Sequence, residues 1–186
     1  MTIYTIGHST RPIADFLGLL ARSSIARLVD IRAFPGSRRH PHFNRETLAR
    51  EVPAAGIEYL HRPSLGGRRR LPPDASPSAW RNDSFHAYAE YMRTAEFHSA
   101  LDELIELGET KRTVIMCSEA VPWRCHRTLV SDALAARGVE VEHILDASIS
   151  PHRITRFAVV QNGEVTYPPT SDAGGNVQHA LELGGS

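Results

Sequence analysis

Short apolar runs alternate with segments of helical periodicity along most of this 186-residue chain. The apolar runs are rich in β-branched residues, which favour strands, and polar turns separate them from the helical segments. Strands are predicted over residues 3–6, 26–31, 57–60, 113–116 and 139–145. Strands that alternate with helices form a mostly parallel sheet, because each crossover carries the chain over one face. We therefore expect a three-layer α/β fold with a mostly parallel sheet of about five strands and helices on both faces.

Two further patterns refine this expectation. The helical region over residues 84–107 has a predicted break near Thr94, and Asn44 is placed to cap a helix that ends at Ala55. Near the C-terminus, the runs 156–160 and 164–167 flank an Asn-Gly pair, which is typical of a two-residue hairpin turn. A C-terminal β-hairpin is therefore expected in addition to the sheet.

The length and composition favour a single α/β domain over residues 1–167, followed by a flexible, glycine-rich tail over 168–186. Two cysteines are too few for a disulfide framework, so a reducing compartment is expected. The N-terminus lacks the basic and apolar regions of a signal peptide, and no apolar run is long enough to cross a bilayer. These features predict a cytoplasmic protein that does not associate with a membrane.

The segment from Val114 to Arg127 holds both cysteines of the chain. Cys117 ends an apolar run, and Cys125 follows a turn, where a helix is expected to begin. Backbone N–H groups at a helix N-terminus and nearby arginines stabilise a thiolate or a bound anion. Cys125 is therefore the predicted nucleophile. The candidate proton carriers, orienting groups and second thiol are His126, His8, Glu119, Asp30 and Cys117.

Polar and charged residues follow four of the predicted strands at their carboxyl ends. Ligands of open parallel sheets bind beyond these ends, so we expect the residues to converge on one site. The predicted anion- or substrate-binding residues are Gly7, Ser9, Arg32, Arg38, Arg39, Gly66, Gly67, Arg68, Ser118, Arg124 and Arg127.

Arginine dominates the basic residues, since Lys111 is the only lysine, although the formal net charge is zero. A genome rich in G and C would give the same bias, so the positions of the arginines decide what they mean. Two loops concentrate arginine, and one of them interleaves it with Phe34 and Phe43. Guanidinium groups bind phosphate with paired hydrogen bonds, and aromatic rings stack on bases. The predicted partner is a phosphate-bearing small molecule or a nucleic acid.

Motif searches exclude several familiar kinds of site. The Walker A, HExxH and GxGxxG motifs are absent. A phosphatase-type loop would place five residues between cysteine and arginine, whereas six separate Cys117 from Arg124. Cys117, Cys125, His126 and His8 could supply four zinc ligands, but the chain lacks CxxC and HxxxH spacing, so no metal and no cofactor is predicted.

The leading hypothesis is an enzyme, a Cys/His-dependent hydrolase or transferase, that acts on a phosphate-bearing small molecule, nucleotide or nucleic-acid end. A first alternative is a non-catalytic module that binds nucleic acid or nucleotides through the basic loops. A second alternative is a thiol redox or metal sensor that uses both cysteines. The sequence gives no indication of the oligomeric state.

A series of motifs runs in order along residues 2–167. It comprises Tyr4-Thr5-Ile6-Gly7-His8-Ser9-Thr10, Val29-Asp30-Ile31-Arg32, Pro35 with Ser37-Arg38-Arg39, Phe43-Asn44, Tyr59, Leu65-Gly66-Gly67-Arg68, Trp80, Tyr88, Met92, and Met116-Cys117-Ser118-Glu119 through Trp123-Arg124-Cys125-His126-Arg127. In these motifs the chain resembles the bacterial and archaeal family known as domain of unknown function 488. The resemblance implies a compact α/β domain with the motifs around one pocket. It implies no particular reaction, so the roles given above come from the residues alone.

Overall fold

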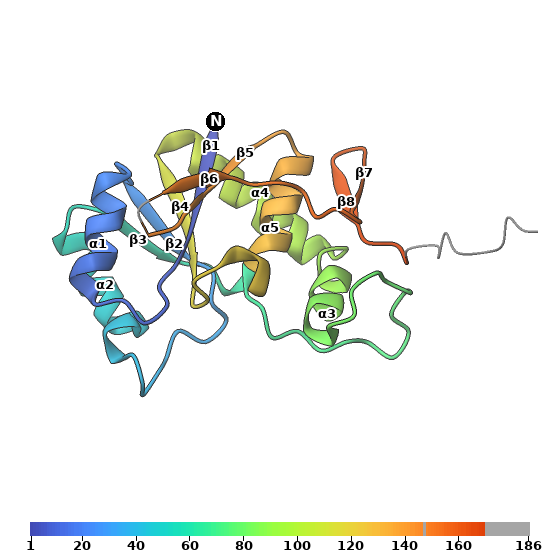
Figure 1. The fold of residues 1–186 in the computed structure, drawn as a ribbon, viewed down its shortest axis with the longest axis horizontal. Coiled ribbons are helices and arrows are strands. Elements are labelled where there is room, and N and C mark those ends of the chain that lie inside the picture. The colour runs from blue at the N-terminus through green and yellow to red at the C-terminus, as the bar shows by residue number, and fades with distance from the viewer. Residues whose placement is uncertain (147, 170–186) are drawn as a thin grey trace, which may run out of the picture.

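The computed structural model describes residues 1–146 and 148–169, built around a six-stranded sheet in the order β3-β2-β4-β1-β5-β6 (Figure 1). The strands are β1 (Thr2–Gly7), β2 (Arg27–Asp30), β3 (Glu58–His61), β4 (Thr113–Cys117), β5 (Glu140–Ile144) and β6 (Ile149–Pro151). The first five strands are parallel, and β6 pairs antiparallel with β5. The predicted mostly parallel sheet is confirmed, with one short edge strand in addition.

The edge strand β6 escaped the sequence prediction because it carries no apolar pattern. It has three residues, and both Ile149 and Pro151 are exposed. Pro151 has no backbone N–H, which suits the edge of a sheet, where no further strand needs a donor.

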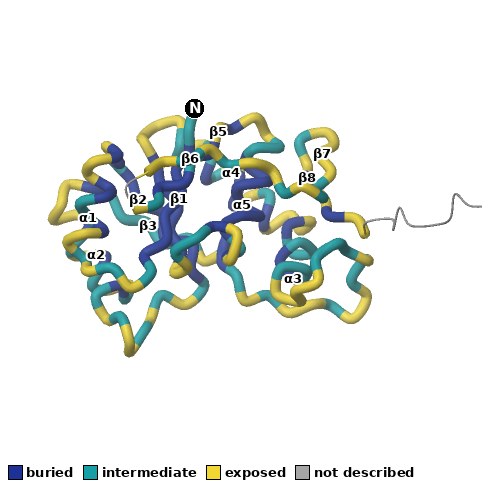
Figure 2. Tube along the Cα trace, viewed as in Figure 1, coloured by how far each residue is buried: buried dark blue, intermediate teal, exposed yellow. Residues whose placement is uncertain are grey.

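Helices cover both faces of the sheet and give the expected three layers (Figure 1). They are α1 (Ile13–Arg22), α2 (Arg45–Ala54), α3 (Asp83–Tyr91), α4 (Ala95–Thr110) and α5 (Arg127–Ala136). Successive strand residues point to opposite faces, so Ile3 and Tyr4 belong to different cores. Tyr4 packs with α1 and α2, whereas Ile3 packs with α3, α4 and α5. Figure 2 shows the buried strands between these layers.

The predicted helix ends are close to the observed ones, but one of the two predicted side-chain caps is not formed. Thr94 separates α3 from α4 and caps α4, because its side chain accepts from the N–H of Phe97. Asn44 does precede α2, but its side chain accepts from the N–H of Ser37 (2.6 Å) instead of capping the helix. The predicted cap at Asn44 is therefore wrong, since its amide holds the arginine-rich loop in place.

The C-terminal hairpin is confirmed as β7 (Val159–Gln161) paired with β8 (Glu164–Thr166). Asn162 and Gly163 have φ angles of 53° and 79°, the left-handed values that a two-residue hairpin turn requires. Val165 packs in the same core as α5, so the hairpin is anchored to that helix.

Residues 170–186, most of the predicted flexible tail, lie outside the described residues. The assignment of residues 1–167 to one domain stays a prediction. None of the described helices combines the length and the apolar character needed to cross a membrane.

Candidate functional site

The carboxyl ends of neighbouring strands bring the predicted residues to one edge of the sheet. Gly7 of β1 pairs with Cys117 of β4, and Asp30 of β2 pairs with Met116 on the other side of β4. Beyond β1, the N–H of His8 donates to the carbonyl of Cys117 (2.9 Å). Because β3 adjoins β2, the loop that follows β3 begins at the same edge. All four strand ends singled out in the sequence therefore lie together.

Two thiols and one imidazole form a compact group at the end of β4, which we call the cysteine–histidine cluster. Nδ1 of His126 lies 3.8 Å from Sγ of Cys117 and 3.6 Å from Sγ of Cys125. The three atoms all lie within 4.8 Å of one another. Both cysteines are unpaired and buried, with 5% and 4% of their surface exposed. The fold thus joins two cysteines whose proximity the sequence left open.

The helix that follows the cluster begins two residues after Cys125. A 3₁₀ turn over Pro122–Arg124 precedes Cys125, His126 occupies the N-cap position, and α5 starts at Arg127. The backbone N–H of Arg127 donates to Sγ of Cys125 (3.4 Å). The predicted thiol at a helix N-terminus is present in this form, with one helix N–H directed at the sulfur.

The surroundings of the two thiols favour a thiolate at Cys117. A hydrogen bond from Cys125 lowers the pKa of Cys117 well below its usual range, and His126 and the charge of Arg127 act in the same direction. The same contact, together with burial, raises the pKa of Cys125. The sequence favoured Cys125 as the thiolate because it reveals the position of Cys125 before a helix but not the contacts between the two thiols and His126.

Arg127 supports the loop between β4 and α5. It is 1% exposed, and its terminal nitrogens donate to the carbonyls of Ile6, Glu119 and Ala120 at 3.0–3.2 Å. Gly7 permits this close approach, because a Cβ at that position would lie 1.7 Å from the carbonyl oxygen of Glu119. Gly7 and the terminal nitrogens of Arg127 therefore belong to the framework of the site, whereas Nε of Arg127 is buried with no hydrogen-bond partner among the described residues.

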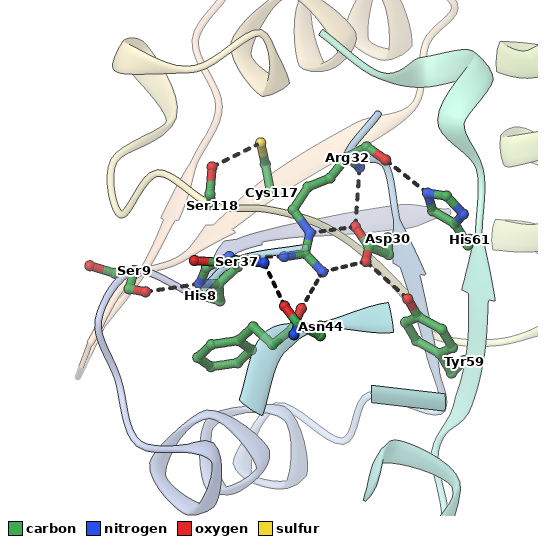
Figure 3. A network of polar contacts seen from close by, with 11 residues as sticks. His8, Ser9, Asp30, Arg32, Ser37, Asn44, Tyr59, His61, Cys117 and Ser118 are labelled. Atoms are coloured by element: carbon green, nitrogen blue, oxygen red, sulfur yellow. Dashed lines mark hydrogen bonds and ion pairs between the residues drawn. The ribbon is translucent and has the colours of Figure 1, made fainter. Parts of the chain in front are cut away.

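Asp30, Arg32 and His8 form a buried network at the same edge (Figure 3). Nε and Nη2 of Arg32 donate to the two carboxylate oxygens of Asp30 at 2.8 and 2.6 Å. Nη1 of Arg32 lies 3.1 Å from Nε2 of His8, whose Nδ1 lies 2.8 Å from the carbonyl oxygen of Ser9. A carbonyl can only accept, so Nδ1 of His8 carries the proton and Nε2 accepts from Arg32.

The environment of His8 keeps it neutral. Burial and the charge of Arg32 lower the pKa of His8 to about 4. Phe43, one of the two aromatic residues of the arginine-rich loop predicted to suit base stacking, is instead fully buried, with its ring 4.2 Å from the His8 ring. Since both nitrogens of His8 are engaged, the geometry favours His126 over His8 as the proton carrier.

Two glycines let the loop after β3 approach the cluster closely. A Cβ at Gly66 would lie 2.8 Å from the backbone nitrogen of Ala33, and one at Gly67 would lie 2.8 Å from Nδ1 of His126. Tyr88 also covers the imidazole, with its ring 5.1 Å from that of His126. The sequence did not identify Tyr88 as a site residue, because its position on the apolar side of α3 is equally typical of a core residue.

Ser9, Ser118 and Glu119 border the cluster without joining it. The N–H of Ser9 donates to the carbonyl of Ser118 (2.9 Å), which extends the pairing of β1 with β4. Oγ of Ser118 lies 4.0 Å from Sγ of Cys117. The side chain of Glu119 is exposed, so this carboxylate faces solvent at the edge of the site.

Four exposed arginines follow the same strand ends and form what we call the basic rim: Arg38, Arg39, Arg68 and Arg124. Within residues 1–146 and 148–169, none of their guanidinium groups makes a hydrogen bond or an ion pair. Phe34 and Trp123 lie on two of these loops and are 71% and 65% exposed. The guanidinium carbon of Arg68 lies 5.9 Å from the centre of the Phe34 ring. Unengaged guanidinium groups beside exposed rings suit phosphates and bases.

A second buried network, centred on Asp132, was not predicted. Its carboxylate accepts from Tyr167 (2.8 Å) and pairs with His152 (2.8 Å), which in turn contacts His143 (3.0 Å). His143 also contacts the hydroxyl of Thr5 (2.7 Å), and burial and the neighbouring His152 lower its pKa to about 4. The network ties α5 to β1, β5 and the C-terminal segment, so it stabilises the helix that follows the cluster.

The fold and this edge define an α/β protein with a cysteine–histidine cluster beside a basic rim. The family model described as Domain of unknown function DUF488 matches residues 12–134, a range that contains the whole cluster and the whole rim. The chain belongs to this family. No curated protein and no solved structure matches the chain.

Proposed function

We propose that this protein is a cysteine- and histidine-dependent enzyme, a hydrolase or transferase, that acts on a phosphate-bearing small molecule, nucleotide or nucleic-acid end. The observation that carries the proposal is the place of the cluster. Its thiols and imidazole lie at the edge where parallel α/β proteins bind ligands, beside the basic rim. A cytoplasmic location belongs to the proposal, because two unpaired thiols are typical of a reducing compartment.

Cys117 is the attacking group in this proposal. Its proton passes to Nδ1 of His126, 3.8 Å away, and the sulfur forms a bond to the electrophilic atom of the ligand. The bond to the leaving group breaks, and the leaving atom takes its electron pair together with the proton from His126. Water or the hydroxyl of a second substrate then attacks the bound atom and passes its proton to His126, and the bond to sulfur breaks to release the thiolate of Cys117.

The basic rim supplies the anion-binding groups. Arg38 and Arg68 are exposed and have unengaged guanidinium groups among the described residues, whereas Arg32 and Arg127 are occupied by protein acceptors. The predicted roles therefore divide: the rim binds the ligand, and the two buried arginines hold the loops that carry the cluster.

The experiment measures how a ligand changes the alkylation rate of Cys117, in the presence of a chelator. The probes are inorganic pyrophosphate and a 5′-phosphorylated dinucleotide, each at about ten times its Kd, and we expect either to slow alkylation by iodoacetamide about tenfold. Arg38→Ala with Arg68→Ala should remove the protection. Arg50→Ala is the control, because that side chain is exposed and pairs only with its neighbour Glu51. Protection that survives loss of the rim arginines would contradict the proposal.

A second candidate function is non-catalytic binding of single-stranded nucleic acid. It is favoured by the exposed rings of Phe34 and Trp123, which are available for base stacking. This function requires the rim and not the thiols. Binding of an oligonucleotide with a steep salt dependence, unchanged in Cys117→Ser and without turnover of any phosphorylated probe, would support it over the enzyme.

A further inference from the structure

We infer that Cys117, Cys125 and His126 form a binding site for a thiophilic divalent cation of the zinc class. Thiolate and imidazole are the donors that zinc prefers, and the cluster presents two of the first and one of the second. The three side chains come from the end of β4 and the start of α5, which are packed elements of the core. The inference concerns metal binding and does not require the enzymatic role proposed above.

The distances within the cluster fit a tetrahedral ion. Zn–S bonds of about 2.3 Å and Zn–N bonds of about 2.0–2.1 Å place sulfur and nitrogen about 3.5 Å apart across a tetrahedral angle. Nδ1 of His126 lies 3.8 Å from one sulfur and 3.6 Å from the other. All three donor atoms lie within 4.8 Å of one another, so small side-chain shifts are enough to close the site on an ion.

The surroundings keep these donors directed at a common point. A side chain at position 67 would collide with Nδ1 of His126, and Gly67 leaves that nitrogen accessible. The ring of Tyr88 packs against the imidazole and restricts its rotation. The N–H of Arg127 donates to Sγ of Cys125, an outer contact of the kind that orients metal ligands.

The charge balance also suits a cation. Binding releases the protons of the two thiols to solvent, and the two resulting sulfur charges offset the ion. His8 is not a fourth ligand, because Nε2 faces Arg32 and Nδ1 faces the carbonyl of Ser9. Three protein ligands leave the fourth position open, the arrangement of zinc sites that bind water or substrate.

A bound cation would control the proposed thiol reaction. A sulfur that coordinates an ion is no longer available to attack, so occupancy of the site and attack by Cys117 exclude one another. Zinc therefore competes with alkylation, and removing it restores a reactive thiol.

The test uses the full chain, stripped with a chelator and dialysed against zinc chloride. We expect about one zinc per chain, and cobalt in place of zinc should give thiolate-to-cobalt charge-transfer absorption. Cys117→Ser, Cys125→Ser and His126→Gln should each weaken binding by about a hundredfold or more, since loss of an outer-shell partner alone costs tenfold to a hundredfold. Ser99→Ala is the matched control and should bind within a few-fold of the wild type, because this serine is exposed on α4, away from the cluster.

Two results would overturn the inference. One is zinc binding no stronger than that of the Cys117→Ser/Cys125→Ser double variant, with folding verified by circular dichroism. The other is unchanged zinc affinity and cobalt absorption in His126→Gln, which would place the ion elsewhere. Neither result would affect the ligand-protection test of the proposed function, because that test is carried out in the presence of a chelator.

Discussion

Arg32 binds Asp30 through two nearly parallel hydrogen bonds, of 2.8 and 2.6 Å, in a pair that is almost completely buried. The backbone N–H of Arg32 (3.1 Å) and the hydroxyl of Tyr59 (2.9 Å) also donate to the same carboxylate. The pair is two residues apart in the chain, and it orients His8 at the end of β1. This buried ion pair thus has a positioning role, in contrast to the exposed arginines of the basic rim.

Asp30→Asn should destabilise the protein strongly. The change leaves the guanidinium of Arg32 buried without its counter-charge, which costs about 3–5 kcal/mol in the free energy of unfolding. Urea denaturation measures this value. Glu51→Gln, which breaks the exposed pair with Arg50, should cost no more than about 1 kcal/mol. Equal effects of the two substitutions would contradict the role assigned to Asp30.

Gly7→Ala should disturb the loop that carries the cluster. A methyl group there would meet the carbonyl of Glu119, so either β1 or the loop has to move, at a cost of about 1–3 kcal/mol. Zinc affinity and the unfolding midpoint should fall together. Gly36→Ala serves as the control, because no atom lies within 4 Å of the added carbon and its φ is not left-handed. A stable Gly7→Ala protein with unchanged zinc affinity would refute this account.

The free energy of unfolding should decrease as the pH is lowered from about 6.5 to about 4. His8 and His143 have pKa values lowered to about 4 by burial, so the unfolded chain binds more protons than the folded chain in this window. Their contribution is complete above the unfolded pKa and is lost as the pH falls, by at most about 3 kcal/mol for either histidine. Histidine ring NMR signals followed against pH give the direct measurement, and titration of either ring above pH 6 would contradict it.

Phe34→Ala and Trp123→Ala should separate nucleic-acid ligands from small anions. Loss of one stacking ring costs about 1–3 kcal/mol for a single-stranded oligonucleotide, and the affinity for pyrophosphate should stay unchanged. Fluorescence anisotropy of a labelled oligonucleotide measures the first affinity, and isothermal titration calorimetry measures the affinity for pyrophosphate. If both ligands weaken equally, or neither does, the rings do not stack on bases.

The alternation of apolar runs and helices was sufficient to predict the sheet, because a parallel sheet constrains every crossover in the same way. The place of the site followed from that fold, since Gly7, Asp30 and Cys117 each end a strand. The sequence pattern carried no information on which arginines are engaged. Arg127 and Arg124 lie three residues apart, yet one donates to three carbonyls and the other is exposed.

Contacts between distant segments account for what the sequence did not predict. The acidity of Cys117 depends on Cys125 and His126, which only the turn at Pro122 brings near it. The network of Asp132 joins side chains up to 35 residues further along the chain, with no repeating pattern to mark them. Such contacts become visible only when the elements are placed in space.

The network of Asp132 can be completed only late in the synthesis of this protein. Asp132 lies on the helix that follows the cluster, and its partners His152 and Tyr167 are made later. While the chain emerges from the ribosome, the carboxylate of Asp132 therefore lacks its hydrogen-bond partners until the later residues have been added. The two cysteines leave the ribosome well before their helix is fully secured. The cysteines of a nascent chain stalled before Tyr167 should therefore be alkylated faster than those of the finished protein, in which both are buried.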